Sequence, residues 1–216
     1  ASVLACVGLW ALIPVVSKTG QSDLDSHQFL FWSSLVSTVA LGGVTFATRA
    51  TAALKSWRPG DWLRAVALGF LGTYLYYILL YFGYAEARGM EVLVLQYSWP
   101  VFVVVFGIII LRENLSWRRA AAVLLGFVGV FLVLTEGNIS DIHLDNLRVD
   151  LLVLAGALAF GLFSVLSKRL AWEPYGLNTV YFLTATAASF VSMLLFSGFA
   201  WPTASTIVPI VINGLL

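Results

Sequence analysis

Charged residues are scarce in this sequence. Only 11% of its 216 residues are Asp, Glu, Lys or Arg, whereas a soluble domain usually contains about 25%. The chain is 60% hydrophobic and its mean hydropathy is +0.93, which excludes an ordinary soluble domain and indicates an integral membrane protein in a lipid bilayer. The formal net charge of +1 points to no charged partner, and we expect no nucleic acid among the partners.

Cysteine and histidine are nearly absent. Cys6 stands alone, which excludes an intrachain disulfide and suggests no metal framework. His27 and His143 fall in expected loops or at a helix edge, where we expect solvated side chains. The sequence also lacks an HExxH motif, a GxSxG motif and an intramembrane pair of Asp or His. We therefore expect no enzyme, no cofactor and no metal site.

Long apolar runs fill the chain instead. Two of them, 92–111 and 118–135, flank a short polar elbow, and each is about as long as the ~20 residues that a transmembrane helix needs. The pattern predicts an all-α membrane protein with seven apolar helices and part of an eighth. We place them at 3–18, 27–47, 62–84, 92–111, 118–135, 151–170, 177–199 and 205–216.

Basic residues gather in alternate connections. The links after the second, fourth and sixth segments contain nine of the 12 Lys and Arg residues, and the other links contain most of the acidic residues. Lys and Arg accumulate in the cytoplasmic loops of membrane proteins, which is the positive-inside rule. The links rich in basic residues are therefore expected to be cytoplasmic, and so is the N-terminus. The nine basic residues are Arg49, Lys55, Arg58, Arg64, Arg112, Arg118, Arg119, Lys168 and Arg169.

The sequence also contains an internal repeat. Residues 9–18 (LWALIPVVSK) align with residues 159–168 (AFGLFSVLSK) at an offset of 150. Five expected helices separate the copies, and an odd number inverts the second copy in the membrane. Lys18 should then lie on the outer side and Lys168 on the inner side. Inverted repeats are typical of secondary transporters, which bind their substrate between the repeats.

The second copy is shorter than the first. We assign the first repeat to 1–135, an extracytoplasmic connecting loop to 136–150, and an incomplete second repeat to 151–216. A complete inverted 5 + 5 arrangement of about ten helices would need roughly 75–80 more residues. We therefore expect the sequence to be a portion of a longer protein.

Several short motifs carry a family resemblance. They are Trp10, Pro14 and Ser17-Lys18, then QYSWP at 96–100, Glu113-Asn114-Leu115, and the pair Gly126/Gly129. These motifs resemble the drug/metabolite transporter superfamily, specifically the family with two EamA repeats, and within it the exporters of aromatic and other amino acids. The resemblance implies an alternating-access carrier in the bacterial inner membrane that exports small amphipathic metabolites, with no cofactor. We expect a monomer.

An aromatic stripe marks the third segment. Phe70, Tyr74, Tyr77, Tyr81 and Tyr84 recur at spacings of 4, 3, 4 and 3, which places them on one helix face. The stripe either faces an internal cavity or packs as ordinary helix contact, but a phenol hydroxyl facing lipid near mid-helix would be costly. At the outer end, a place in an interfacial aromatic belt suits Tyr84.

Two prolines interrupt apolar helices. Pro14 and Pro100 each remove a backbone hydrogen bond, which frees the carbonyls of Trp10 and Gln96. The interruptions are either packing kinks or helix breaks used in gating, because irregular backbone at membrane depth is tolerated where it lines a cavity. We expect Glu113 to form an ion pair near Arg112 and Arg118 or to cap a helix.

The expected substrate site lies between the first, third, fourth and sixth segments. Aromatic walls would hold an apolar group, freed carbonyls would accept from an ammonium group, and Lys18 or Lys168 would be charge partners. A phosphorylated-solute or nucleotide-sugar exchanger and a small cationic drug carrier are the alternatives, but a phosphate site would need several Lys or Arg. The candidate residues are Trp10, Tyr74, Tyr77, Tyr81, Gln96, Trp99, Ser164 and Ser167, with Pro14 and Pro100 as helix breaks.

Overall fold

The computed structural model describes residues 8, 11–114, 116–134, 146–170 and 172–216. Within these residues the fold is helical and contains no strand. Five described helical stretches are long and apolar enough to cross a membrane: 26–47, 59–86, 89–111, 147–168 and 174–196. The prediction of an all-α membrane protein is confirmed.

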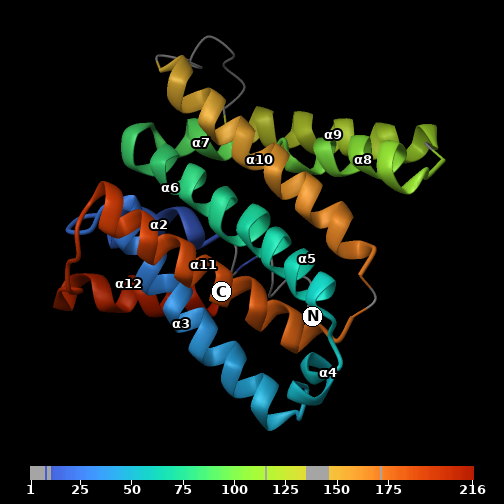
Figure 1. Cartoon of the computed structure of the whole chain (residues 1–216). Helices are drawn as coiled ribbons and strands as arrows, with labels where there is room; N and C mark the ends of the chain where they lie inside the picture. The colour runs from blue at the N-terminus through green and yellow to red at the C-terminus, as the bar shows by residue number, and fades with distance from the viewer. Residues whose placement is uncertain (1–7, 9–10, 115, 135–145, 171) are drawn as a thin grey trace.

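The helices follow the expected order (Figure 1). Trp10 and His143 lie outside the described residues. The first segment contains α2, and α4 is a short helix that the hydrophobic pattern did not predict. The bounds are α2 Ile13–Gly20, α3 Ser26–Ala47, α4 Thr51–Lys55, α5 Pro59–Gly69, η1 Phe70–Leu75, α6 Tyr76–Glu86, α7 Gly89–Gln96, α8 Trp99–Leu111, α9 Trp117–Leu134, α10 Leu147–Lys168, α11 Pro174–Phe196 and α12 Ala204–Leu215.

Helix breaks occur within the third and fourth segments. The third runs from Pro59 to Glu86, but its middle six residues form the π-helical turn η1. The fourth is divided at Tyr97-Ser98, between α7 and α8, and Pro100 sits in the first turn of α8. Pro at this position is favourable because the N–H it lacks would have no partner inside the helix. The QYSWP interruption is therefore a real helix break.

The packing of the described helices follows the inverted repeat. The second and seventh helices, α3 and α11, lie antiparallel, because His27 contacts Ser192 at one end and Thr45 contacts Thr179 at the other. The third helix packs on the sixth (α6 on α10), and the eighth packs on the first (α12 on α2). These two contacts exchange when the first and third helices of one repeat are matched in order to those of the other, as two copies related by a twofold axis require.

The two repeat-related lysines meet different groups. On α2, the Lys18 ammonium lies 3.4 Å from the carbonyl oxygen of Ala87, just after α6. Lys168, at the end of α10, forms an ion pair of 2.7 Å with Glu113. The expectation that Glu113 forms an ion pair is confirmed. The partner in this ion pair is Lys168, which lies far from Glu113 in sequence.

Candidate functional site

A cavity of about 110 Å³ opens between the first, third, fourth and sixth helices. We call it the tyrosine pocket, because six of its ten described lining residues are aromatic and none of the ten is charged. These are the four helices between which we predicted the substrate site from the sequence. Its lining is Ile13, Pro14, Tyr76, Tyr77, Tyr84, Leu93, Gln96, Tyr97, Trp99 and Phe160.

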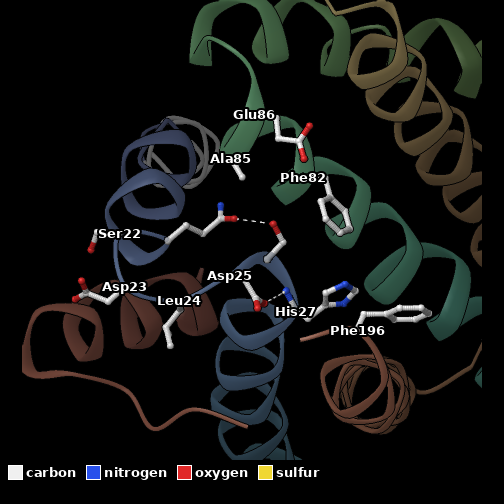
Figure 2. Close-up of a pocket in the computed structure, with 11 residues that line it drawn as sticks. Ser22, Asp23, Leu24, Asp25, His27, Phe82, Ala85, Glu86 and Phe196 are labelled. Atoms are coloured by element: carbon white, nitrogen blue, oxygen red, sulfur yellow. Dashed lines mark hydrogen bonds between the residues drawn. The ribbon is translucent and has the colours of Figure 1, made fainter. Parts of the chain in front are cut away.

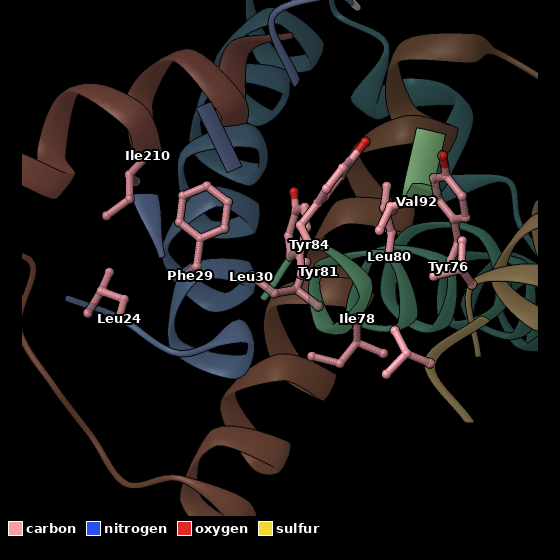
Figure 3. Packing of buried hydrophobic residues seen from close by; sticks show 12 residues of the cluster. Leu24, Phe29, Leu30, Tyr76, Ile78, Leu80, Tyr81, Tyr84, Val92 and Ile210 are labelled. Atoms are coloured by element: carbon pink, nitrogen blue, oxygen red, sulfur yellow. The ribbon is translucent and has the colours of Figure 1, made fainter. Parts of the chain in front are cut away.

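Gln96 organises the polar side of the tyrosine pocket. Its amide oxygen accepts a hydrogen bond of 3.0 Å from the Tyr84 hydroxyl, and its amide nitrogen donates one of 2.8 Å to the Tyr76 hydroxyl. Tyr84 and Tyr76 are 2% and 5% exposed, so Gln96 provides their hydroxyls with partners in a buried place. Figure 3 shows both tyrosines in the buried cluster around α6.

Local sequence explains this arrangement. Tyr76 and Tyr84 are eight residues apart, which brings both to the same side of α6. Gln96 is the last residue of α7, directly before the break at Tyr97-Ser98. Pro100 lacks a backbone N–H and cannot donate to the Gln96 carbonyl, so the hydrogen-bond ladder of α7 does not continue through that position.

Aromatic rings form the remaining wall. The Phe160 ring of α10 lies 4.6 Å from the Tyr76 ring and 5.3 Å edge-on from the Trp99 ring, measured between centroids. Edge-on and tilted arrangements at these separations are favourable for aromatic pairs. The wall therefore joins the third, fourth and sixth helices around one small, uncharged space.

A second cavity of about 280 Å³ lies between α3, α6, α11 and α12. We call it the serine pocket, because Ser33, Ser34 and Ser37 line it. The Ser33 hydroxyl is buried and has no hydrogen-bond partner among the described residues, while the Tyr81 hydroxyl accepts a bond of 2.7 Å from Asn213. Tyr77 lines both cavities and therefore lies between them.

The structure gathers some predicted site residues and separates others. Pro14, Pro100, Tyr77, Gln96 and Trp99 lie at or beside the tyrosine pocket. Tyr81 lies on the serine pocket instead.

Three of the predicted substrate-binding residues line neither cavity, and neither do the predicted charge partners Lys18 and Lys168. The Ser164 hydroxyl donates to the Phe160 carbonyl of its own helix, and Ser167 bonds Tyr181 at 3.2 Å. Tyr74 packs on Phe70, with ring centroids 5.1 Å apart. The π-helical turn explains this last case, because its extra residue disturbs the spacing on which the predicted aromatic stripe depends.

Sequence reasoning missed two residues and misjudged two. Tyr76 is not on the predicted stripe, yet it lies on the pocket. The assignment of Tyr84 to an interfacial belt is wrong, because Tyr84 is buried and bonded to Gln96. His27 is not a solvated surface residue either: it is half-buried and bonds Ser192. Asp150, predicted to be the last residue of the connecting loop, is instead 3% exposed in the first turn of α10.

Comparison with known proteins decides the family. The EamA-like transporter family matches residues 1–135, which is more than half of the chain. The chain belongs to this family. Membership of the EamA-like family, part of the drug/metabolite transporter superfamily, points to transport across a membrane and not to catalysis.

Relatives of this EamA-family chain are distant in sequence. A protein of Archaeoglobus fulgidus named as an uncharacterized transporter is 24% identical over 195 residues, which is 90% of this chain and 66% of that protein. The uncharacterized transporter YyaM of Bacillus subtilis is 24% identical over 70% of this chain and 50% of its own length. A protein of Rickettsia bellii named as an S-adenosylmethionine uptake transporter is 25% identical over 81% of this chain and 56% of that protein.

One solved crystal structure shares the fold. It superposes with a TM-score of 0.77 at 20% identity, covering 96% of this chain and 70% of the other. The EamA-family chain thus spans about half to two thirds of the length of the curated relatives above.

Proposed function

We propose that this EamA-family protein is a secondary transporter that carries a small amphipathic metabolite with an amino-acid head group across a membrane by alternating access. The supporting observation is the tyrosine pocket: an uncharged aromatic cavity with Gln96 at its polar side, between helices that belong to both repeats. Aromatic rings would hold the apolar part of the solute, and the amide and phenol groups would bind its head group.

The chemistry of the lining separates the candidate substrates. Neither the tyrosine pocket nor the serine pocket has a Lys or Arg among its described lining residues, which disfavours the alternative of a phosphorylated solute or nucleotide sugar. An onium compound is a second candidate, because a cation is attracted to the faces of Trp and Tyr rings. The naming of several Rickettsia relatives as S-adenosylmethionine uptake transporters supports this candidate.

Flux measurements test the proposal. The full-length protein in proteoliposomes is offered a panel of radiolabelled amino acids together with S-adenosylmethionine, and protein-dependent flux of at least one of them is expected. Flux of none of these compounds, with flux of a phosphorylated solute instead, would contradict the proposal.

Tyr77→Phe tests the site within the tyrosine pocket. Among the described residues the Tyr77 hydroxyl makes no hydrogen bond, and this hydroxyl is therefore available to a solute in either cavity. Its removal leaves the ring and should weaken recognition by about 1–1.5 kcal/mol, roughly tenfold in the half-saturating concentration. Tyr175→Phe, an exposed position on α11 outside the pocket linings, is the matched control. An unchanged half-saturating concentration for Tyr77→Phe would exclude this hydroxyl from the site.

We also infer the orientation of the chain. The N-terminus is placed in the cytoplasm of a bacterium, residues 1–135 and 151–216 form the two repeats, and 136–150 connects them outside. Single cysteines at Ser22 and Ala53 in a Cys6→Ser background should react with a membrane-impermeant maleimide from opposite sides, Ser22 from outside. In the structure Ser22 is exposed and Ala53 is half-buried. Labelling of Ala53 from outside in intact cells would reverse the assignment.

A further inference from the structure

A third cavity lies apart from the tyrosine and serine pockets. It has a volume of about 690 Å³ and lies at the end of the molecule that the charge pattern places outside. We call it the outer pocket (Figure 2). Its lining is Gln21, Ser22, Asp23, Leu24, Asp25, Ser26, His27, Phe82, Ala85, Glu86 and Phe196.

His27 enters the outer pocket between two aromatic rings. Its imidazole is stacked on Phe196, with centroids 5.6 Å apart, and meets Phe82 edge-on at 5.3 Å. The rings come from the ends of α6 and α11, so three helices hold the imidazole in place. Figure 2 shows the imidazole between these two phenyl rings.

Hydrogen bonding assigns the tautomer of His27. Its Nδ1 lies 3.0 Å from the Ser192 hydroxyl oxygen, and that hydroxyl donates to the Ser189 carbonyl at 3.1 Å. A hydroxyl has a single proton, so we assign the proton of the His27–Ser192 bond to Nδ1. Nε2 of the neutral ring is then a hydrogen-bond acceptor.

The three carboxylates of the outer pocket differ in their hydrogen-bond partners. Asp25 caps α3, accepting from the backbone N–H groups of His27 and Gln28, and it also bonds Ser197. Asp23 accepts from the hydroxyls of Ser205 at 2.7 Å and Thr203 at 2.9 Å, and these bonds lower the pKa of the Asp23 carboxyl.

Glu86 is the carboxylate that remains. Glu86 is the last residue of α6 and is exposed, and its carboxylate forms no hydrogen bond or ion pair with the described residues. Within the described residues the outer pocket therefore offers one available carboxylate and one imidazole acceptor beside two phenyl rings, with no Lys or Arg in its lining.

We propose that the outer pocket binds an organic ammonium ion with an apolar side group. The Glu86 carboxylate and His27 Nε2 accept hydrogen bonds from the ammonium, and Phe82 and Phe196 contact the apolar group. An ion of this class gains from charge-assisted hydrogen bonds at its ammonium group and from burial of its apolar group against the two rings. Binding of the ammonium ion does not depend on the proposed function. Only the idea that a transported solute binds at this site rests on it.

Equilibrium dialysis of the full-length protein in lipid nanodiscs tests this site. The probes are 2-phenylethylammonium, the neutral 2-phenylethanol and the anionic 3-phenylpropionate, which share the phenyl group and differ in charge. The ammonium should bind about tenfold or more tightly than the alcohol, and the anion should not compete.

Two variants remove the proposed binding groups with little change to the fold. His27→Asn keeps an amide donor near Nδ1 for Ser192 but removes the Nε2 acceptor, and Glu86→Gln removes a charge from an exposed side chain. Each should weaken binding of 2-phenylethylammonium about fivefold to tenfold. Asp23→Asn is the control, because this carboxylate is occupied by Ser205 and Thr203.

The outcomes are distinct. Equal affinity for the ammonium and the alcohol, or unchanged affinity in both variants, overturns the outer site and leaves the proposed transport untouched. Charge-selective binding that both variants weaken supports the site, and it does so even if no amine is transported, since dialysis measures no flux.

Discussion

Gln96→Leu should destabilise the protein by about 2–4 kcal/mol. Leucine has a similar volume but removes the amide that joins Tyr84 and Tyr76. Both tyrosine hydroxyls are then left in a buried place without their partner, and an unsatisfied buried polar group costs about 1–3 kcal/mol. The loss is measured as a lower unfolding midpoint of the purified protein and as lower flux at matched expression.

A second substitution shows whether the hydrogen bonds cause this loss. Removing both partners of a buried hydrogen bond can be nearly neutral, so Tyr84→Phe combined with Gln96→Leu should be less destabilising than the two single effects added together. Full additivity would mean that Gln96 and Tyr84 act independently, and the polar side of the tyrosine pocket would then need another explanation.

Gly161→Val should separate two helices that carry the pocket wall. A Cβ atom built at Gly161 of α10 would lie 2.6 Å from Phe102 Cβ and 3.2 Å from Phe102 backbone carbon on α8. Backbone atoms cannot rotate away, so α8 and α10 must move apart. Overpacking of this kind costs about 1–3 kcal/mol.

The same substitution should reduce flux more than it reduces stability. Trp99 of α8 packs edge-on against Phe160 of α10 in the wall of the tyrosine pocket, and a displacement of about 1 Å can lower a rate roughly 100-fold. Gly126→Val on α9 is the control, since a Cβ atom there meets nothing within 4 Å. Equal losses in both variants would indicate a general effect of replacing glycine in a membrane helix.

An uncharged pocket has a consequence for the choice of solute. The tyrosine pocket and the serine pocket offer rings, hydroxyls and amides, and the part of each lining that the structure describes includes no Asp, Glu, Lys or Arg. A solute with a net charge would lose its hydration without gaining a counter-ion, which is costly. Zwitterions, whose charges compensate each other, and soft cations on aromatic faces fit this lining better.

The sequence by itself determined the architecture. Hydrophobic run lengths located the described spans, since a bilayer requires about 20 apolar residues of each helix. The offset that relates Lys18 to Lys168 predicted an inverted repeat, and the reciprocal contacts of α6 with α10 and of α12 with α2 follow it. Pro100 predicted the break in the fourth helix, because proline acts on the backbone locally.

Only the tertiary structure decided which polar groups meet. Helical periodicity assumes a regular helix, and the π-helical turn at Phe70–Leu75 broke that regularity, so Tyr74 left the predicted face and Tyr76 lay on the pocket. The partners of Gln96, His27 and Glu113 are Tyr84, Ser192 and Lys168, which are 12, 165 and 55 residues away. Contacts at such separations arise from the packing of whole helices, and neither composition nor local spacing contains that information.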